Sequence, residues 1–249
     1  MRAIQLGLGL LSIGRTWGVA NVPPPDEAAA RRLIETAFDA GIRFFDTAPA
    51  YARSELILGR VLRDRLDLAN NCTIATKMGE QWDAESQTSR VSHSWEDLIR
   101  SLDTSLNLLR RIDILQIHKA NATNVTSDAV LAAIDYARSA GVRQFGVSVT
   151  DLETARLACE SGQYAFVQLP FNSQNVAMKP VLELLQEHDI KPIVNRPFAM
   201  GAIANQAGSS PTNAFRFVRA HMTSGIVLTG TSRETHLLQN IAAFQAAVL

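Results

Sequence analysis

Four side chains that can carry charge or exchange protons stand at or just beyond the ends of predicted buried strands. Asp46 ends the apolar run that contains FFD, and Tyr51 follows it five positions later. Lys77 ends the run ATK, and His118 ends LQIH. Side chains at the carboxyl ends of parallel strands, and in the loops that follow, form the functional face of α/β barrels and sheets. One such residue alone is usually structural or solvated, so it is the set of four that indicates a site.

These residue types suit the protonation of an oxygen atom while a neighbouring carbon receives a nucleophile. A tyrosine with the ordinary pKa of about 10 exchanges protons poorly at neutral pH, and a nearby ammonium lowers that pKa. We expect Lys77 to supply the ammonium to Tyr51 and Asp46 to keep Lys77 protonated. His118 can donate a hydrogen bond to a carbonyl oxygen that lies against the phenol.

Strands and helices alternate along the chain to position these residues. Periodicity and capping residues predict each helix, and short apolar runs predict each strand. The predicted strands are 5–11, 44–48, 73–77, 112–118, 145–149, 165–170, 191–197 and 226–230. The predicted helices begin near Asp26, Ser54, Ser94, Asp128, Thr150 or Asp151, Pro180, Asn213 and Ser232. The expected caps are Ser54, Ser94, Thr150 or Asp151, and Ser232. Eight such units predict a closed (β/α)₈ TIM barrel that forms a single domain over residues 1–249.

Two loops are candidates for binding the substrate. The polar stretch from Gly79 to Ser92 is too long for an ordinary connection in a barrel, and Gly201 to Pro211 follows a predicted strand. Trp82 lies in the first loop and Trp17 follows the first strand, so both side chains either pack structurally or line a pocket.

The composition excludes several classes of partner. Basic and acidic residues balance at 24 each, so no basic field is present to attract nucleic acid or an anionic membrane. We also find no apolar stretch of about 20 residues that would span a membrane. Two cysteines without CxxC spacing suit a reducing compartment, and we expect a cytoplasmic protein. The histidines form no metal-binding pattern, so no metal is expected, and the oligomeric state stays open.

The four residues and the motifs around them resemble the aldo-keto reductases over nearly the whole chain. The matching motifs are FFDTAPAY, ATK and LQIH, in the family's order of Asp, Tyr, Lys and His. The resemblance implies that Tyr51 is the general acid, that Lys77 and Asp46 tune it, and that His118 orients a small carbonyl substrate. It also implies a nicotinamide cofactor as hydride source, with NADPH the usual form and NADH less favoured.

The same resemblance assigns residues to the cofactor. Ser148 and Gln168 would hold the nicotinamide carboxamide. The segment TGTSRETHLLQN would surround the adenosine 2′-phosphate and the adenine through Gly230, Thr231, Ser232, Arg233, His236 and Asn240. The physical chemistry agrees, because a helix N-terminus attracts an anion and Arg233 adds a charge-assisted donor. Ser232 alone is equally consistent with an ordinary helix cap.

Two positions depart from the family pattern. Val149 stands where an asparagine is frequent, and Asn195 stands where an aromatic residue often stacks on the nicotinamide. Arg196 follows directly, and its guanidinium can stack or contact a phosphate instead.

Other interpretations remain open on the residues alone. Lys77 in an apolar site suits the Schiff-base nucleophile of a barrel aldolase, although Asp46 as a counter-charge opposes a neutral amine. A nicotinamide-binding sensor or interaction subunit with little turnover is a second alternative. The glycine-rich segment near Gly7 nearly matches a dinucleotide fingerprint, but Ser12 replaces its third glycine and no helix is predicted after it.

Overall fold

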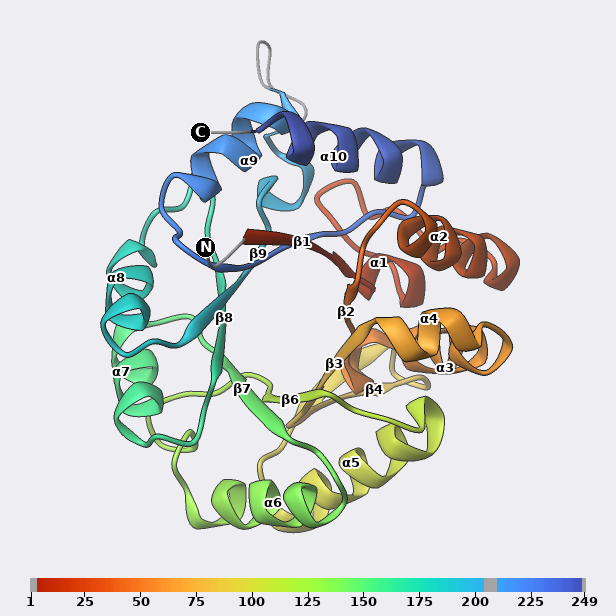
Figure 1. Ribbon diagram of the computed structural model, residues 1–249. Helices are drawn as coiled ribbons and strands as arrows, with labels where there is room; N and C mark the ends of the chain where they lie inside the picture. The colour runs from red at the N-terminus through yellow and green to blue at the C-terminus, as the bar shows by residue number, and fades with distance from the viewer. Residues whose placement is uncertain (1–3, 204–209, 248–249) are drawn as a thin grey trace.

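A computed structural model describes residues 4–203 and 210–247, and in it eight parallel strands close into a barrel surrounded by helices (Figure 1). The barrel strands are β1 (Ile4–Gly9), β2 (Phe44–Asp46), β3 (Thr73–Met78), β6 (Ile114–Ile117), β7 (Gln144–Ser148), β8 (Phe166–Pro170), β9 (Lys191–Asn195) and β10 (Gly225–Thr229). Each strand pairs with the next in chain order, and β10 pairs with β1 to close the ring. The (β/α)₈ prediction is confirmed.

Helices cover the outside of the barrel on all sides (Figure 1). They are α2 (Glu27–Asp39), α3 (Ser54–Asp64), α4 (Leu66–Asn71), α5 (Trp95–Leu109), α6 (Asp128–Ser139), α7 (Leu152–Glu160), α8 (Lys179–Glu187), α9 (Pro211–Arg219) and α10 (Glu234–Ala246). Three short turns lie in loops, namely α1 (Leu11–Gly14), η1 (Pro49–Tyr51) and η2 (Ala199–Gly201). The part of the chain that the structure describes contains no helix long and apolar enough to cross a membrane.

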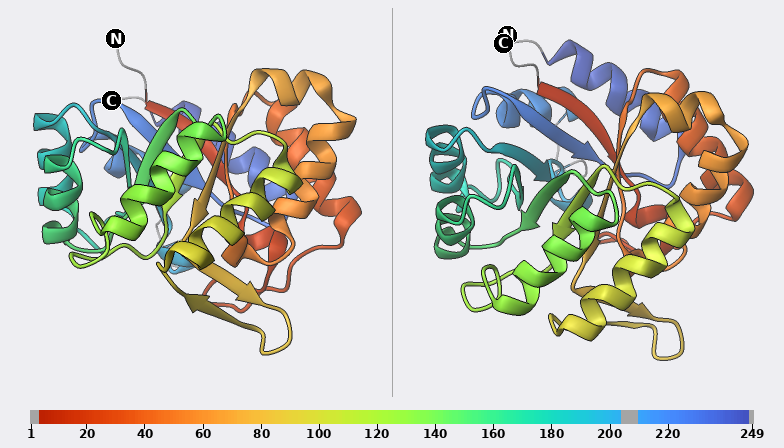
Figure 2. Two further views of the ribbon diagram at one scale, coloured as in Figure 1. Left: turned by 90° about the horizontal axis from the view of Figure 1, so that it is seen from below. Right: turned by 60° about the horizontal axis from the view of Figure 1, so that its bottom comes forward.

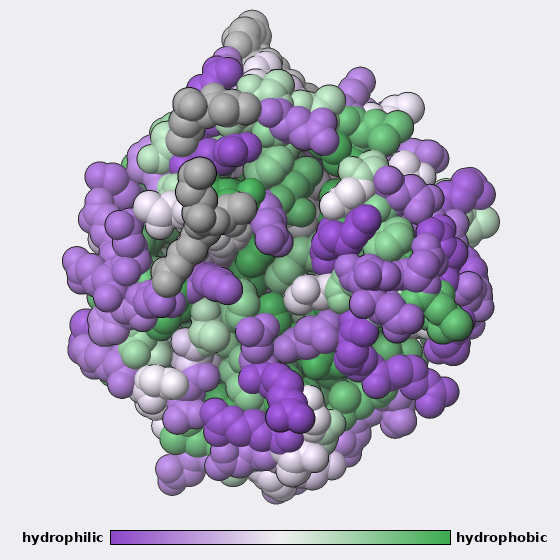
Figure 3. Space-filling view, viewed as in Figure 1, coloured by the Kyte–Doolittle hydropathy of each residue, from purple (hydrophilic) through white to green (hydrophobic). Residues whose placement is uncertain are grey.

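The core has two layers, as a closed barrel requires. A large outer cluster fills the space between the strands and the helices. A smaller inner cluster fills the barrel and comprises Phe44, Ala75, Ile114, Phe166, Ile193, Ile226 and Leu228. Three of its members, Phe44, Ile114 and Phe166, are the first residues of their strands, which places the cluster toward the amino ends. Figure 3 shows apolar side chains at the centre of the face seen in Figure 1.

The predicted loop from Gly79 to Ser92 is an antiparallel hairpin of β4 (Glu80–Asp83) and β5 (Thr88–Val91). Its turn is organised by Asp83, whose Oδ1 accepts hydrogen bonds from the amides of Glu85 and Ser86. The hairpin continues from the carboxyl end of β3 and projects from the barrel at the end opposite the start of β1 (Figure 2). Of the second predicted loop, residues 204–209 lie outside the described residues.

The helix caps agree with the sequence at two positions and differ at two. The Ser94 and Asp151 side chains accept hydrogen bonds from the amides of Asp97 and Thr154, as caps do. Ser54 instead lies inside α3, fully buried, where its hydroxyl contacts that of Thr47. Pairing with another buried hydroxyl takes the place of capping there.

The prediction that Ser232 caps the last helix is also wrong. The N-cap of α10 is Arg233, and no side chain accepts from the first turn. The Thr231 hydroxyl accepts the amide of Arg233 at 3.1 Å and so shapes the turn before the helix. The expectation of a single domain over residues 1–249 stays a prediction.

Candidate active site

The central feature of the carboxyl-terminal face is a buried ion pair between β2 and β3. The Nζ atom of Lys77 donates to both carboxylate oxygens of Asp46, at 2.8 and 2.7 Å, and to the carbonyl oxygen of Thr47 at 2.9 Å. The side chain of Lys77 is fully buried, and that of Asp46 is 3% exposed. From β6, Gln116 Nε2 donates to Asp46 Oδ1 at 3.0 Å. Neighbouring parallel strands thus bring together residues that are far apart in the sequence.

Tyr51 ends the η1 turn and lies over this pair. Its ring centroid is 4.8 Å from Lys77 Nζ, and 6.0 Å from the ring of His118, which meets it edge-on at 83°. Gly14 permits the close approach of α1, because a Cβ atom there would lie 1.8 Å from the Tyr51 carbonyl oxygen. All four predicted catalytic residues therefore lie in one cluster.

The protonation state of Tyr51 follows from two opposing effects. Burial raises the pKa of Tyr51, while the positive charge of Lys77 lowers it less strongly, and the net shift is upward. The ammonium of Lys77 acts in the expected direction, but desolvation of the phenolate outweighs it. Tyr51 is consequently a neutral phenol at physiological pH, able to donate a proton.

Lys77 stays charged in spite of its burial. Desolvation would lower the pKa of Lys77, but the negative charge of Asp46 and its hydrogen bonds to Lys77 outweigh desolvation, so the net shift is upward. A Schiff-base lysine needs a neutral amine. The ion pair therefore disfavours an aldolase role for Lys77.

His118 is buried and neutral. Desolvation, followed by the positive charges of Lys77, Lys119 and Arg15, holds the pKa of His118 well below its usual value. Its Nδ1 atom lies 3.1 Å from Glu80 Oε2 on the hairpin, in a contact that does not meet hydrogen-bond geometry. The backbone is also fixed, since the His118 carbonyl oxygen is 2.8 Å from His93 Nε2.

The residues expected at the nicotinamide lie on adjacent strands. Ser148 at the end of β7 is the register partner of Gln168 on β8, and Asn195 is the partner of Pro170 on the following pair. Gln168 is buried, and the Oδ1 atom of Asn195 is buried without a hydrogen-bond partner. Near the ends of the neighbouring strands β10 and β1, the unpartnered hydroxyl of Ser12 lies beside Gly230. Two unsatisfied buried polar atoms in this part of the barrel mouth fit a polar cofactor, because such atoms are rare in the absence of a ligand.

The segment that precedes α10 has the features of an anion site. Gly230, Arg233 and His236 are exposed, and Ser232 is half-buried. Since no side chain caps α10, its first amides are available to an acceptor. Two further assigned residues have structural contacts: Thr231 shapes the turn, and Asn240 is buried and donates to Thr229 Oγ1 at 2.9 Å.

Arg196 lies apart from the β7 and β8 residues. It is exposed, has a left-handed backbone with φ of 56°, and its guanidinium carbon is 5.8 Å from the centroid of the Trp17 ring. Its carbonyl oxygen accepts from Asn172 Nδ2 at 2.9 Å. The side chain is therefore stacked on an aromatic residue of the first loop.

Comparisons with known proteins agree with this geometry. The sequence model described as "Aldo/keto reductase family" matches residues 5–212. The chain belongs to the aldo/keto reductase family. The Pseudomonas aeruginosa protein PA4992, described as an aldo-keto reductase, superimposes with a TM-score of 0.81 at 27% identity, over 97% of this chain and 90% of that one.

Two curated relatives match a smaller share of their own length. A Bacillus subtilis oxidoreductase, YqkF, is 23% identical over 206 residues, which are 81% of this chain and 63% of YqkF. Pyridoxal 4-dehydrogenase of Microbacterium luteolum is 26% identical over 82% of this chain and 69% of its own length. The chain thus spans about two thirds of the curated relatives that it matches.

Three contacts of this aldo/keto reductase site were not anticipated from the sequence. Gln116 binds Asp46, Glu80 faces His118, and Arg15 extends its charge toward His118. Gln116 had a signal: it is a polar residue in a buried apolar strand, two positions before His118 and so on the same strand face. The sequence gives no comparable signal for Glu80 and Arg15, because the positions of both side chains depend on how loops fold over the barrel.

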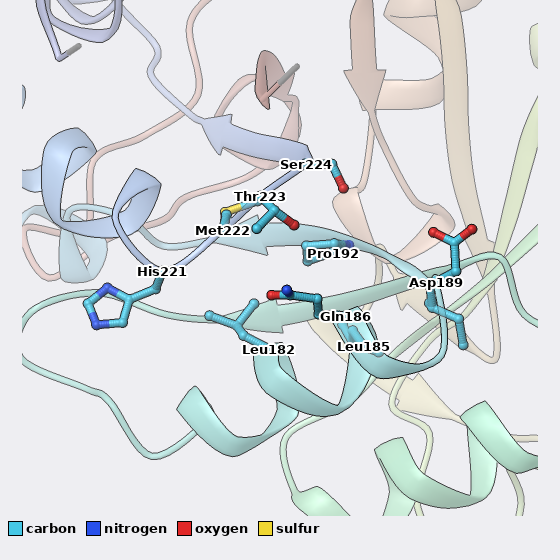
Figure 4. Close-up of a pocket in the computed structure, with 10 residues that line it drawn as sticks. Leu182, Leu185, Gln186, Asp189, Pro192, His221, Met222, Thr223 and Ser224 are labelled. Atoms are coloured by element: carbon cyan, nitrogen blue, oxygen red, sulfur yellow. The ribbon is translucent and has the colours of Figure 1, made fainter. Parts of the chain in front are cut away.

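A surface hollow elsewhere lies far from this chemistry. Figure 4 shows it between α8 and the segment before β10, lined among others by Leu182, Gln186, His221 and Thr223. These residues precede the amino ends of β9 and β10, whereas Asp46 and Lys77 lie at the carboxyl ends of their strands. None of the residues assigned to catalysis or to the cofactor lines it.

Proposed function

We propose that this aldo/keto reductase reduces an aldehyde or ketone to the alcohol with NADPH, and that Tyr51 is the general acid. The observation that carries the proposal is the neutral phenol of Tyr51 set over the buried Lys77–Asp46 ion pair and against His118. Similarity to oxidoreductases supports the reaction class.

Each of the four clustered residues has a separate proposed role at the substrate oxygen. When bound, NADPH supplies the hydride to the carbonyl carbon. Tyr51 donates its phenolic proton to the oxygen, on which negative charge develops. Lys77 stabilises the phenolate left on Tyr51, and Asp46 keeps Lys77 charged and in place. Neutral His118 orients the carbonyl by hydrogen bonding to its oxygen.

A preference for NADPH over NADH follows from the segment before α10. The uncapped helix amides and the exposed guanidinium of Arg233 would bind the additional 2′-phosphate of NADPH. Ser148, Gln168 and Asn195 would bind the nicotinamide, with the unpartnered Asn195 Oδ1 accepting from an amide. We expect Arg233→Ala to weaken NADPH binding about tenfold with little change for NADH, as measured by quenching of protein fluorescence.

The test of the general acid is the Tyr51→Phe variant. It removes the proton and leaves the ring, so turnover of an aromatic aldehyde should fall at least about 100-fold while the Kd for NADPH stays close to that of the wild type. Turnover is followed as loss of NADPH absorbance. Full activity in Tyr51→Phe would exclude the assigned role. Tight NADPH binding by the wild type with no turnover of any aldehyde or ketone would instead favour a sensor.

A further inference from the structure

Arg15 occupies a position between the proposed proton donor and the hairpin. It follows α1 directly, and α1 is packed against the Tyr51 turn through Gly14. On its other side, the guanidinium carbon of Arg15 lies 4.8 Å from the centroid of the Trp82 ring on β4. The same strand carries Glu80, which contacts His118. The planar guanidinium is therefore held against an aromatic surface at the edge of the catalytic cluster.

The charge of Arg15 has no counter-charge among the described residues. No carboxylate of the described residues forms an ion pair with its guanidinium, and its Nε atom is buried without a hydrogen-bond partner. Some arginines on the outside of the barrel do have ion pairs: Arg60 binds Glu27 at 2.6 Å, and Arg65 binds two aspartates. A buried guanidinium nitrogen that binds nothing incurs a desolvation cost that a ligand would offset.

The acidic groups around the site are held by residues other than Arg15. Asp46 is neutralised by Lys77, and Glu80 faces neutral His118 and accepts a hydrogen bond from Ser89 at 2.6 Å. The field of Arg15 extends to the catalytic centre, where it is one of the positive charges that act on His118. A substrate placed between Tyr51 and His118 would therefore lie within the field of a cation that has no ion-pair partner among the described residues.

We propose that Arg15 binds an oxyanion on the substrate, so that this reductase prefers aldehydes or ketones that carry a carboxylate or phosphate group. This inference rests on the proposed function and adds the substrate class. A guanidinium matches both oxyanions through two parallel hydrogen bonds, and stacking on Trp82 fixes its plane for that purpose. The carbonyl carbon would lie at Tyr51 and the anionic end at Arg15.

The experiment compares two substrates that differ in one charge, 4-carboxybenzaldehyde and methyl 4-formylbenzoate. We expect the wild type to show a kcat/KM at least about tenfold higher for the carboxylate, mainly through KM. Arg15→Gln should reduce this ratio to near one, and Arg15→Lys should retain part of it because the charge remains. Arg32→Gln, an exposed arginine on α2, is the control for a change in net charge and should keep the wild-type ratio.

The outcomes separate this inference from the proposed function. If the wild type reduces neither aldehyde, the proposed function fails. If it reduces both equally, or if Arg15→Gln lowers both kcat/KM values by the same factor, the inference about Arg15 is overturned. A weaker Kd for NADPH in Arg15→Gln, with an unchanged substrate ratio, would assign the guanidinium to a cofactor phosphate and also overturn it. Replacing the carboxylate by a phosphate in 4-formylphenyl phosphate shows which oxyanion binds better.

Discussion

The buried ion pair of Asp46 and Lys77 makes each charge dependent on the other. Asp46→Asn leaves the Lys77 ammonium without a counter-charge in a site closed to water. We expect the free energy of unfolding to fall by about 3–5 kcal/mol, as measured by guanidinium denaturation. The double variant Asp46→Asn/Lys77→Met also removes the unpaired ammonium, so it should regain much of the lost free energy of unfolding. It should not regain turnover. Equal stability of the wild type and Asp46→Asn would contradict a buried charged pair.

Glu55 is a second buried carboxyl group, but it has no cation as partner. Burial, only partly offset by the hydrogen bond from Thr76 Oγ1 at 2.6 Å, raises the pKa of Glu55 to about 7. A raised pKa means that the folded state holds its proton more tightly than the unfolded state does. The stabilisation is complete below about pH 4.5 and is lost as the pH rises to about 7.

The expected size of this effect is about 3 kcal/mol, because the pKa of Glu55 rises from 4.5 to about 7 and a tenfold change in proton affinity corresponds to about 1.4 kcal/mol. Glu55→Gln should therefore show a smaller loss of stability between pH 5 and pH 8 than the wild type, because the amide does not ionise. Urea denaturation at both pH values measures the difference. Parallel losses in the two proteins would show that Glu55 does not ionise in this range.

At the residue scale, the sequence predicted that the four proposed catalytic residues lie together, but it did not predict their electrostatics. Residue type and strand position were enough to bring Asp46, Lys77 and His118 together. The net direction of the Tyr51 pKa shift was not predicted, because it depends on how deeply the phenol is buried. That burial follows from the packing of β4, α3 and α1 on the Tyr51 turn, which leaves no pattern in the sequence.

The hairpin of β4 and β5 is joined to the catalytic strand β3 through Gly79. This residue has φ of +108°, and a Cβ atom there would lie 2.6 Å from His93 Nε2 and 3.1 Å from the His118 carbonyl oxygen. We expect Gly79→Ala to displace the hairpin, with a loss of about 2 kcal/mol in stability and about tenfold in kcat/KM. Both quantities are measured on the purified variant.

Gly141→Ala is the matched control for that change. Gly141 has a similar φ of +98°, but an added Cβ atom would meet nothing within 4 Å. The free energy of unfolding of Gly141→Ala should therefore fall by only about 1 kcal/mol, the cost of a positive φ for alanine, and the variant should keep its activity. Similar kinetics in the two variants would mean that the contact with His93 and His118 does not hold the site.

Among the elements, periodicity identified the eight strand–helix units, because each needs one apolar face toward the barrel. Capping was less reliable. Ser94 and Asp151 lie exposed at helix starts and act as caps, whereas Ser54 faces the interior and pairs with Thr47. The hairpin was read as an irregular loop because its strands are only four residues each and mostly polar.

At the scale of the whole molecule, the proposed catalytic residues and the apolar residues that fill the barrel lie toward opposite ends of the strands. The catalytic cluster lies at the carboxyl ends of β2, β3 and β6, and the inner apolar cluster lies toward the amino ends. Substitutions in the inner cluster should therefore change stability with little effect on the reaction. Ile226 is suitable, because it is buried near the start of β10 and belongs to that cluster.

The graded pair Ile226→Val and Ile226→Ala tests this separation. Loss of one methylene should cost about 1 kcal/mol, and loss of three carbons about 2–5 kcal/mol, because the rigid ring of strands cannot collapse into the cavity. Guanidinium denaturation gives the stabilities, and kcat is measured at a temperature where both variants are folded. If kcat stays within about twofold of the wild type while stability falls in steps, the two ends of the barrel act independently. A fall in kcat that parallels the loss of stability would instead show that packing at the amino ends is transmitted through the strands to Tyr51 and Lys77.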